Sequence, residues 1–246
     1  MKKTVFLALL SLLSAATLRA DAVTDAIARA AEQAPREALA TLEAAAKAAP
    51  GRADLLAERS IAWSDCADIE AKKGARKEAA TRAMELAQKA VAAGPRLARA
   101  HLALAVACGK MTDHVDNSTK MTLSRQIREE ALRTVELDPR EALAYEILGR
   151  WEYGFATLNP LLKAAARMVY GELPPASLEN AAGYLEKAVK LNPDAISPNY
   201  QLALVYKAMG EKAKALRQWK AVAALPATDA EDEAARKEAA RAIGKP

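Results

Sequence analysis

The sequence has 246 residues, of which 52% are hydrophobic and only 4% aromatic. Alanine supplies much of the apolar share, and alanine combines a small side chain with the highest helix propensity. Ten glycines and eleven prolines are enough to separate helices but too few for a linker-rich or disordered chain. The formal net charge of +5 is small, and the composition predicts an all-α protein in one elongated domain.

The first 22 residues are predicted to be a signal peptide. Lys2 and Lys3 precede an apolar run at residues 5–13, and small residues follow. The run is shorter than the roughly 20 apolar residues that a membrane-spanning helix needs. An uncleaved anchor is the alternative interpretation. Cleavage is expected after Ala22, with Ala16 or Ala20 as other possible sites.

Removal of residues 1–22 takes away three basic residues and one acidic residue. Lys and Arg fall from 36 to 33, Asp and Glu from 31 to 30, and the net charge from +5 to +3. The remaining charges of both signs are mixed along the predicted helices, which argues against a nucleic-acid interface. We expect no stable membrane span after processing and a periplasmic location, with secretion or attachment to the cell envelope as alternatives.

One spacing pattern recurs five times: an apolar residue, another four residues later, a third three residues further on, and then a proline. It begins at Ala38, Ala83 and Ala181, and weaker copies begin at Ile127 and Ala215. Positions four and seven apart share one face of a helix, and the proline ends that helix. The pattern is that of the second helix of tetratricopeptide (TPR) repeats, and it predicts a TPR-like α-solenoid of antiparallel helix pairs in a single domain, residues 23–246.

The first helix of each predicted pair has a pattern of its own. Small residues recur at one position, where they let two helix axes approach closely, and large aromatic residues fill the space between helices. The small residues are Ser60, Ala105, Gly149 and Ala203, and the aromatic residues are Trp63 and Tyr206.

Three of the four repeat steps are longer than the standard of about 34 residues. The steps are 45, 44, 54 and 34 residues, and we expect the excess between the first and second helices, as longer helices or as extra structure in the connection. The longest step contains an insertion at residues 156–176, with Asn159 as its predicted helix cap, Pro160 in its first turn and Ser177 at the next helix start. Its apolar stripe consists of Leu161, Leu162, Ala165, Met168 and Val169. The predicted helix ends at the chain-breaking residues Gly171, Pro174 and Pro175.

This insertion has two possible roles. We expect it to cover one mouth of the groove or pack on a neighbouring repeat, and contact with a membrane is the alternative. After the last repeat, a capping helix is predicted at residues 229–243, opened by a capping box of Thr228 and Glu231.

From Ala100 to Ile243 the sequence resembles the regulator of microtubule dynamics (RMD) family. The matching segments are residues 100–105 (AHLALA), 136–139 (ELDP), 148–151 (LGRW), 170–171 with 174–175, and 225–229 with 231–232. The resemblance implies a helical protein without catalytic activity; animal members are associated with organelles and linked by name to microtubules, and lipid binding is reported in the family. The short signal peptide departs from those members and suggests an exported bacterial relative, for which only the architecture is carried over.

Motifs for catalysis, cofactors or metals are missing from the sequence. His101 and His114 do not have ligand spacing, and His101 is expected to be a satisfied interior histidine. Asp113 and Asp116 suggest a cation loop only weakly, because the glycine and the terminal glutamate of a calcium loop are lacking, and a polar connection is the preferred interpretation. We therefore expect a non-enzymatic protein without a cofactor.

Two cysteines, Cys66 and Cys108, occur late in the first helices of adjacent repeats. An exported protein can form a disulfide between them, and two buried free thiols are an equal alternative.

The predicted groove is lined by four positions on each first helix, by analogy with TPR proteins. Its mixture of apolar, aromatic and basic groups suits an extended peptide or an amphipathic ligand with an acidic end, which Arg150 could bind through a carboxylate. The alternative for Arg150 is an ion pair within the chain, with Glu146 one helical turn away. The lining residues are Arg99, Leu102, Val106 and Gly109, then Leu143, Glu146, Arg150 and Tyr153, then Ser197, Tyr200, Leu204 and Lys207.

Two functions follow from these residues. The first is an interaction module that binds a protein or peptide segment in the groove. The second is a carrier of a lipid or another small amphipathic ligand, with the insertion closing an apolar pocket.

Overall fold

The computed structural model describes residues 21–170 and 175–244, and these residues form helices, turns and connections without a strand. Residues 1–20, which hold most of the predicted signal peptide, lie outside the described part, as do Gly171 and Pro174. Contacts divide the chain into two compact units, unit 1 up to Glu130 and unit 2 from Ala131. Each unit is described by itself, and the single domain stays a prediction.

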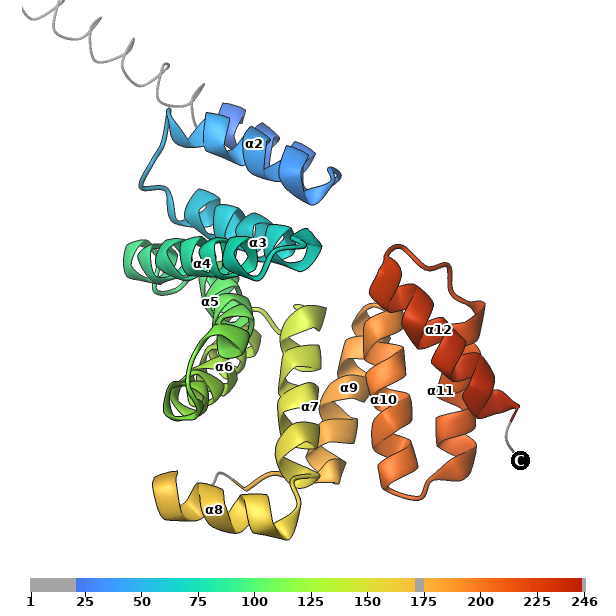
Figure 1. Ribbon diagram of the computed structural model, residues 1–246. Helices are drawn as coiled ribbons and strands as arrows, with labels where there is room; N and C mark the ends of the chain where they lie inside the picture. Colours follow the sequence, from blue (N-terminus) through green and yellow to red (C-terminus); the bar gives the residue numbers. More distant parts are fainter. Residues whose placement is uncertain (1–20, 171–174, 245–246) are drawn as a thin grey trace, which may run out of the picture. The chain divides into compact units, whose positions relative to one another are not determined.

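Unit 1 is a set of helix pairs that follow one another in sequence (Figure 1). Helix 21–30 precedes α2 (Pro35–Ala46), and α3 (Ala53–Ile69) pairs with α4 (Lys73–Ala93). Next come α5 (Ala98–Met111), the short 3-10 helix η1 (Thr112–His114) and the larger part of α6 (Asn117–Leu137). Helix α3 packs on α2, α4 and α5, and it contributes residues to both apolar cores of this unit.

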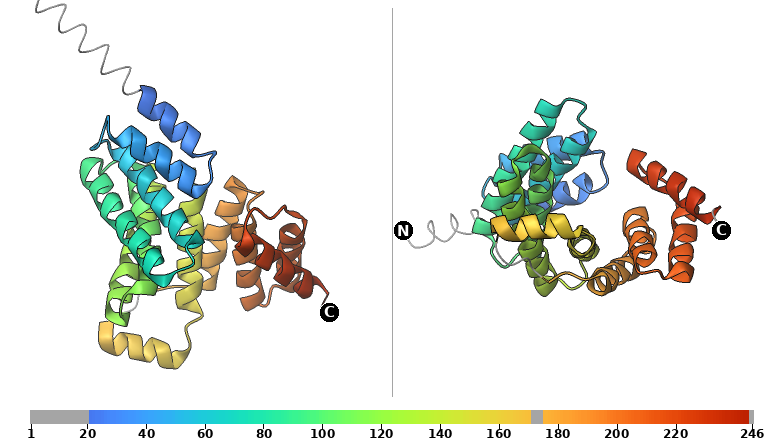
Figure 2. Two further views of the ribbon diagram at one scale, coloured as in Figure 1. Left: turned by 45° about the horizontal axis from the view of Figure 1, so that its top comes forward. Right: turned by 60° about the horizontal axis from the view of Figure 1, so that its bottom comes forward.

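Unit 2 repeats this organisation (Figure 2). It contains α7 (Ala142–Ala156), α8 (Pro160–Tyr170), α9 (Leu178–Leu191), α10 (Ile196–Ala208), α11 (Lys212–Ala224) and α12 (Ala230–Ile243). Helix α7 packs on α9, α10 packs on α9 and α11, and α12 packs on α10 and α11. None of the described helices is both long enough and apolar enough to cross a bilayer.

The five apolar stripes found in the sequence lie on α2, α4, α6, α9 and α11, the second helices of the pairs. In α4 the stripe residues Ala83, Ala87 and Ala90 are all completely buried. Small alanine side chains keep the helix layers thin, and larger residues fill the remaining space in α9 and α11. These residues are Leu185, Trp219 and Val222. The prediction of an all-α fold built from helix pairs is therefore confirmed.

The close approach predicted at the small-residue position is clearest at Gly149 of α7. A Cβ atom there would lie 2.5 Å from Cγ of Leu185 and 3.2 Å from the carbonyl oxygen of Ala181, both on α9. Only glycine therefore fits without a shift of α9. In unit 1 the same role falls to Ser60, which is fully buried and donates a hydrogen bond of 2.8 Å to the carbonyl of Ala83 on α4.

The long repeat steps have two structural causes, both of which the sequence analysis allowed. Helices α4 and α6 have 21 residues each, whereas α9 has 14 and α11 has 13. The 54-residue step instead contains the extra helix α8. Asn159 caps α8 by accepting a hydrogen bond of 2.8 Å from the backbone N–H of Leu162, and Ser177 caps α9 through the N–H of Asn180.

The final helix α12 begins as predicted, but its cap is shifted by one residue. Asp229 accepts a hydrogen bond of 2.8 Å from the N–H of Asp232. Asp232 in turn accepts bonds from both the N–H and the hydroxyl of Thr228, at 3.0 and 2.7 Å. The predicted Thr228–Glu231 box is therefore wrong. Asp229 and Asp232 instead accept from the N–H groups of Asp232 and Thr228, and their charges favour the helix N-terminus.

Candidate interaction face

The predicted lining residues lie on α5 in unit 1 and on α7 and α10 in unit 2. We call the exposed sides of α3 and α5 the first-helix face of unit 1, and those of α7 and α10 the first-helix face of unit 2. Only the second set brings two predicted groups of residues onto neighbouring helices, because α7 and α10 are in contact.

Two ion pairs join α3 and α5 on the first-helix face of unit 1. Arg99 holds Glu58 with two parallel hydrogen bonds of 2.7 and 2.9 Å, a bidentate geometry that fixes both side chains. Lys110 reaches both oxygens of Asp68 at 2.6 and 2.5 Å. The predicted ligand contact of Arg99 is thus replaced by a contact within the chain.

Leu102 is wrong as a lining residue. Its side chain is completely buried, because its side of α5 is turned into the protein. Val106 and Gly109 are half-buried, as are the charged neighbours Arg99 and Lys110. The sequence register placed one core residue on the surface.

Asp65 of α3 lies between Glu58 and Asp68 in the sequence. Desolvation raises the pKa of its carboxyl, and Asp68 and Glu58 raise it further, while Lys110 and Arg99 lower it. Charged groups of both signs from α3 and α5 therefore act on Asp65.

In unit 2 a buried carboxylate connects α7 to α10. Glu146 is 7% exposed and accepts a hydrogen bond of 2.5 Å from the hydroxyl of Ser197. Desolvation raises the pKa of Glu146, and the Ser197 bond and the Arg150 charge oppose that rise. Glu146 therefore acts within the protein and is not available to a ligand.

Arg150 lies on the same helix one turn further on, and its side chain is 58% exposed. Its Nη1 atom is 3.8 Å from Oε1 of Glu146, which is an ion-pair distance but too long for a hydrogen bond. The internal pair that the sequence offered as an alternative is therefore present and weak. It leaves the hydrogen-bonding fork of the guanidinium facing solvent.

Tyr200 of α10 joins the first-helix face to the capping helix. Its hydroxyl donates a hydrogen bond of 2.6 Å to Glu238 of α12, and its ring meets Trp219 edge-on with ring centres 5.5 Å apart. Burial, together with the Glu238 carboxylate, raises the pKa of Tyr200 to about 12. The phenol therefore remains a neutral donor at physiological pH.

The other predicted residues of unit 2 differ in how far they are exposed. Tyr153 and Leu204 are half-buried and pack against the apolar core of the unit. Lys207 and Leu143 are exposed. The face thus combines aromatic and aliphatic surface with two exposed cations, Arg150 and Lys207.

The histidines form no metal site in the part of the chain that the structure describes. His101 is 8% exposed, with Nδ1 at 2.6 Å from Glu130 and Nε2 at 3.0 Å from the carbonyl oxygen of Pro95. It is the satisfied interior histidine that the sequence predicted. Asp116 is the N-terminal cap of α6 through the N–H groups of Ser118 and Thr119, which lower its pKa. Among the described residues, no group of three His, Cys, Asp or Glu could hold a metal ion.

Cys66 and Cys108 are both buried free thiols in the structure. Burial raises the pKa of each thiol, for Cys108 to about 12. At neutral pH both are thiols and not the reactive thiolates.

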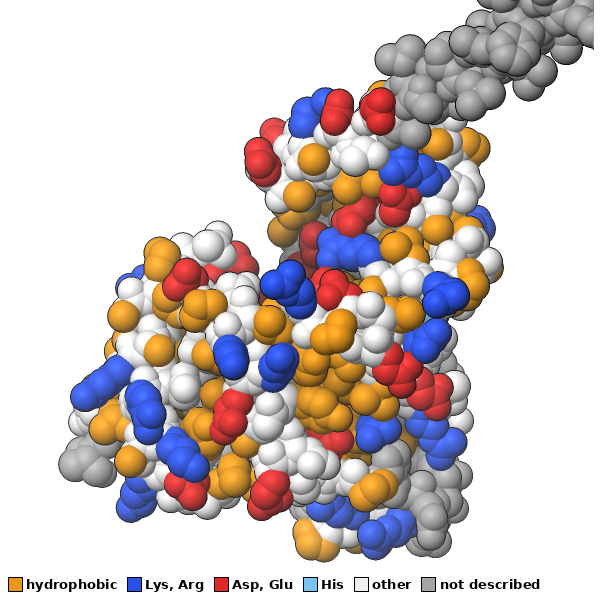
Figure 3. All heavy atoms as spheres, turned by 180° about the vertical axis from the view of Figure 1, so that it is seen from behind, with side chains coloured by type: hydrophobic (Ala, Val, Ile, Leu, Met, Phe, Trp, Pro, Cys, Tyr) orange, Lys and Arg blue, Asp and Glu red, His pale blue; other side chains and the backbone are white. Residues whose placement is uncertain are grey.

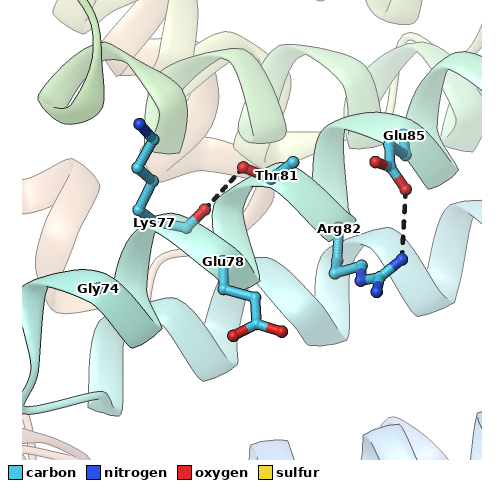
Figure 4. Close-up of a pocket in the computed structure, with 6 residues that line it drawn as sticks. All are labelled: Gly74, Lys77, Glu78, Thr81, Arg82 and Glu85. Carbon is cyan, nitrogen blue, oxygen red and sulfur yellow. Dashed lines mark hydrogen bonds and ion pairs between the residues drawn. The ribbon is translucent and has the colours of Figure 1, made fainter.

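Two surface hollows near the start of α4 are lined by polar groups. The one in Figure 4 follows a single side of α4, where Arg82 pairs with Glu85 at 3.6 Å and Thr81 donates to the carbonyl of Lys77. The other lies between α4 and η1 and includes His114, whose buried Nδ1 atom has no hydrogen-bond partner among the described residues. Neither hollow is the apolar pocket that a lipid carrier needs.

On the face drawn in Figure 3, Lys and Arg side chains are mixed with Asp and Glu over the described residues. This distribution agrees with the mixed charges of the sequence.

Sequence reasoning missed several residues that connect elements far apart in the chain. Glu152 of α7 is 1% exposed and accepts a hydrogen bond of 3.1 Å from the N–H of Ser177, where the chain returns from the insertion. The Glu58–Arg99 and Asp68–Lys110 pairs were also missed. The two residues of each pair are 41 and 42 residues apart in the sequence. Opposite charges separated by about one repeat step could therefore have predicted these pairs.

Comparison with solved structures shows that this arrangement is a TPR-like α-solenoid. The TPR protein TTC0263 of Thermus thermophilus superposes with a TM-score of 0.61 over 92% of this chain and 98% of that chain, at 18% identity. Pseudomonas aeruginosa pilF superposes with a TM-score of 0.57 over 92% and 88%, at 16% identity. At these identities the likeness concerns the fold alone.

The sequence comparisons define the family within that class. Residues 21–245 match the family of regulator of microtubule dynamics proteins 1-3, and the chain belongs to that family. Mouse regulator of microtubule dynamics protein 3 is 28% identical over 76% of this chain and 40% of its own length. Human regulator of microtubule dynamics protein 2 is 27% identical over 72% and 43%. The chain therefore spans about two fifths of the length of these relatives.

Proposed function

We propose that the protein is a non-catalytic interaction module that binds a protein or peptide segment on the first-helix face of unit 2. The observation that carries this proposal is Arg150, an exposed guanidinium whose ion-pair partner, Glu146, lies 3.8 Å away and is already bonded to Ser197. A carboxylate from a partner can approach the open fork with better geometry than Glu146 does.

The other predicted residues on α7 and α10 indicate what kind of segment fits. Tyr153 and Leu204 offer aromatic and aliphatic surface, and Lys207 adds a second exposed cation. An extended segment with apolar side chains and an acidic side chain or terminal carboxylate complements these groups. The first-helix face of unit 1 is a poorer candidate, because its cations already hold Glu58 and Asp68.

A photo-crosslinking residue at Lys207 tests this face in the cell that makes the protein. We expect adducts with a specific partner from position 207, and none from the exposed control position Lys220 on α11. Arg150→Ala should reduce the adducts about tenfold or more, whereas Arg217→Ala, an exposed arginine on α11, should leave them unchanged. Equal crosslinking from positions 207 and 220 would contradict the proposal.

We also propose that the protein is exported and acts in the periplasm, as the Lys2–Lys3 start and the apolar run at residues 5–13 indicate. Mass measurement of the protein purified from the envelope fraction tests this proposal. We expect a chain that begins at Val23, after cleavage following Ala22. Cleavage after Ala20 or Ala16 would give a chain that begins at Asp21 or Thr17. An intact Met1 in a cytoplasmic fraction would contradict export.

A further inference from the structure

Helix α8 presents two neighbouring leucines to solvent. Leu161 is 78% exposed and Leu162 is 52% exposed, the two largest exposed fractions among the large hydrophobic residues that the structure describes. Water contact with such side chains is unfavourable, and paired exposed leucines mark a surface that another apolar phase covers. In the sequence, positions 165, 168 and 169 continue the helical apolar spacing that begins at these leucines.

The charges of α8 are all of one sign. Its 11 residues contain Lys163 and Arg167 and no acidic residue. Arg167 is exposed, and the Nζ atom of Lys163 donates a hydrogen bond of 3.0 Å to the carbonyl of Ala156 at the end of α7. A short helix that combines exposed apolar residues with basic residues complements an anionic lipid surface, where the apolar residues enter the headgroup boundary.

The helix is held in place before any contact is made. Asn159 caps its N-terminus, and Lys163 ties its first turn to α7. Where the chain returns to α9, the buried Glu152 of α7 holds the N–H of Ser177. The first turn of α8 and the start of α9 are therefore both held on α7, which reduces the ordering that binding would otherwise require.

We propose that α8 is a contact site for an anionic lipid surface, with Leu161 and Leu162 as the inserting residues. This inference goes beyond binding of a protein segment and does not depend on it. Two leucines and two cations make only a small contact, so the association is weak, reversible and sensitive to salt.

Vesicle co-sedimentation tests the proposal with the chain purified from residue 21 onward, because all three apolar cores are built from residues after that point. We expect binding to vesicles of equal parts phosphatidylglycerol and phosphatidylcholine, and much weaker binding to phosphatidylcholine alone. Leu161→Ser with Leu162→Ser should lower the anionic-vesicle affinity about tenfold or more. The control Leu216→Ser, at a leucine of α11 that is 39% exposed, should leave it unchanged.

Arg167→Glu separates the charge contribution from the apolar one. It should weaken binding to the anionic vesicles and leave the residual binding to phosphatidylcholine unchanged, and higher salt should reproduce its effect on the unaltered protein. Far-UV circular dichroism and the melting temperature should stay the same in all three variants, because the altered side chains are exposed.

A fluorescent reporter locates the contact. Because Cys66 and Cys108 are buried, Leu161→Cys can be labelled selectively with an environment-sensitive dye, and Leu216→Cys is its matched control. We expect a blue shift at position 161 only, on anionic vesicles only. The proposal fails if the unaltered protein does not prefer anionic vesicles, if the double leucine variant binds them equally well, or if that variant instead abolishes a concentration-dependent dimer seen by light scattering.

Discussion

The two units share the same kind of core but differ in the chemistry between their first helices. In both, the apolar stripe of a second helix is completely buried, on α4 in unit 1 and on α9 in unit 2. Between α3 and α5 of unit 1, two ion pairs join one first helix to the next. Between α7 and α10 of unit 2, the connection is a buried glutamate bonded to a serine. The repeat pattern thus determines the architecture. The residues of the first helices determine whether the charged side chains of a face are paired within the chain or are open to a partner.

The largest effect on stability is expected at Gly149, where α7 and α9 approach so closely that a side chain does not fit. Gly149→Ala places a Cβ atom 2.5 Å from Cγ of Leu185, so α7 and α9 must separate or repack. We expect a loss of about 1–3 kcal/mol in the free energy of unfolding, measured by urea denaturation. Unit 1 has no such sensitivity at the equivalent positions, because Ser60 and Ala105 already carry a Cβ.

Gly154→Ala is the matched control, on the same helix. No heavy atom lies within 4 Å of its added Cβ, so the better helix propensity of alanine should stabilise the protein by about 0.5–1 kcal/mol. Equal effects of the two substitutions would show that the close approach of α7 and α9 is not needed.

The next effect concerns the buried carboxylate that joins α7 to α10. Ser197→Ala removes the hydroxyl that donates to Glu146, and we expect a loss of about 1–3 kcal/mol near neutral pH. Unchanged stability in urea denaturation would mean that Glu146 finds another donor, and the hydrogen bond would then not define the unit 2 contact.

The same carboxylate gives unit 2 a pH dependence. Because burial raises the pKa of Glu146 in the folded protein, the folded state binds more protons, and its stability declines as pH rises above the ordinary glutamate value of about 4.3. Glu146→Gln should therefore flatten the decline above the ordinary glutamate pKa, as measured by urea denaturation at several pH values. An unchanged slope would contradict the assignment of this effect to Glu146.

Local patterns in the sequence predict the fold well. The spacing of Ala83, Ala87 and Ala90 is a property of one helix, and so is the cap of α8 at Asn159, and both are confirmed. The first-helix face is harder to predict because it depends on the rotation of each helix. A rotation of one residue in α5 is enough to turn Leu102 from the surface into the core.

The partners of charged groups also lie beyond local patterns. Glu146 could be paired with Arg150 from their spacing, but its stronger partner is Ser197, 51 residues away. Likewise, Tyr200 was expected to face a ligand, and its hydroxyl is held by Glu238 of the capping helix. Such contacts form only once the helices have packed.

A smaller effect should follow from removal of that hydroxyl. Tyr200→Phe keeps the ring on Trp219 and loses the hydrogen bond to Glu238, and we expect a loss of about 0.5–1.5 kcal/mol by urea denaturation. Crosslinking from position 207 should persist. Tyr200→Ala is less suitable, because it would also remove the ring contact and change stability and binding together. If Tyr200→Phe lowers both the stability and the crosslinking, Tyr200 has a structural role only.

The smallest effect is expected from the ion pairs that distinguish unit 1. In a double-mutant cycle of Arg99→Ala and Glu58→Ala, we expect a coupling energy of about 0.2–1 kcal/mol, because the side chains are 37% and 20% exposed and water screens the pair. Added salt should reduce this coupling. The matched cycle in unit 2, Arg150→Ala with Glu146→Ala, should show less coupling, since those atoms are 3.8 Å apart. A stronger coupling there would mean that Arg150 is compensated within the chain as Arg99 is, and it would remove the reason to place a partner's carboxylate on unit 2.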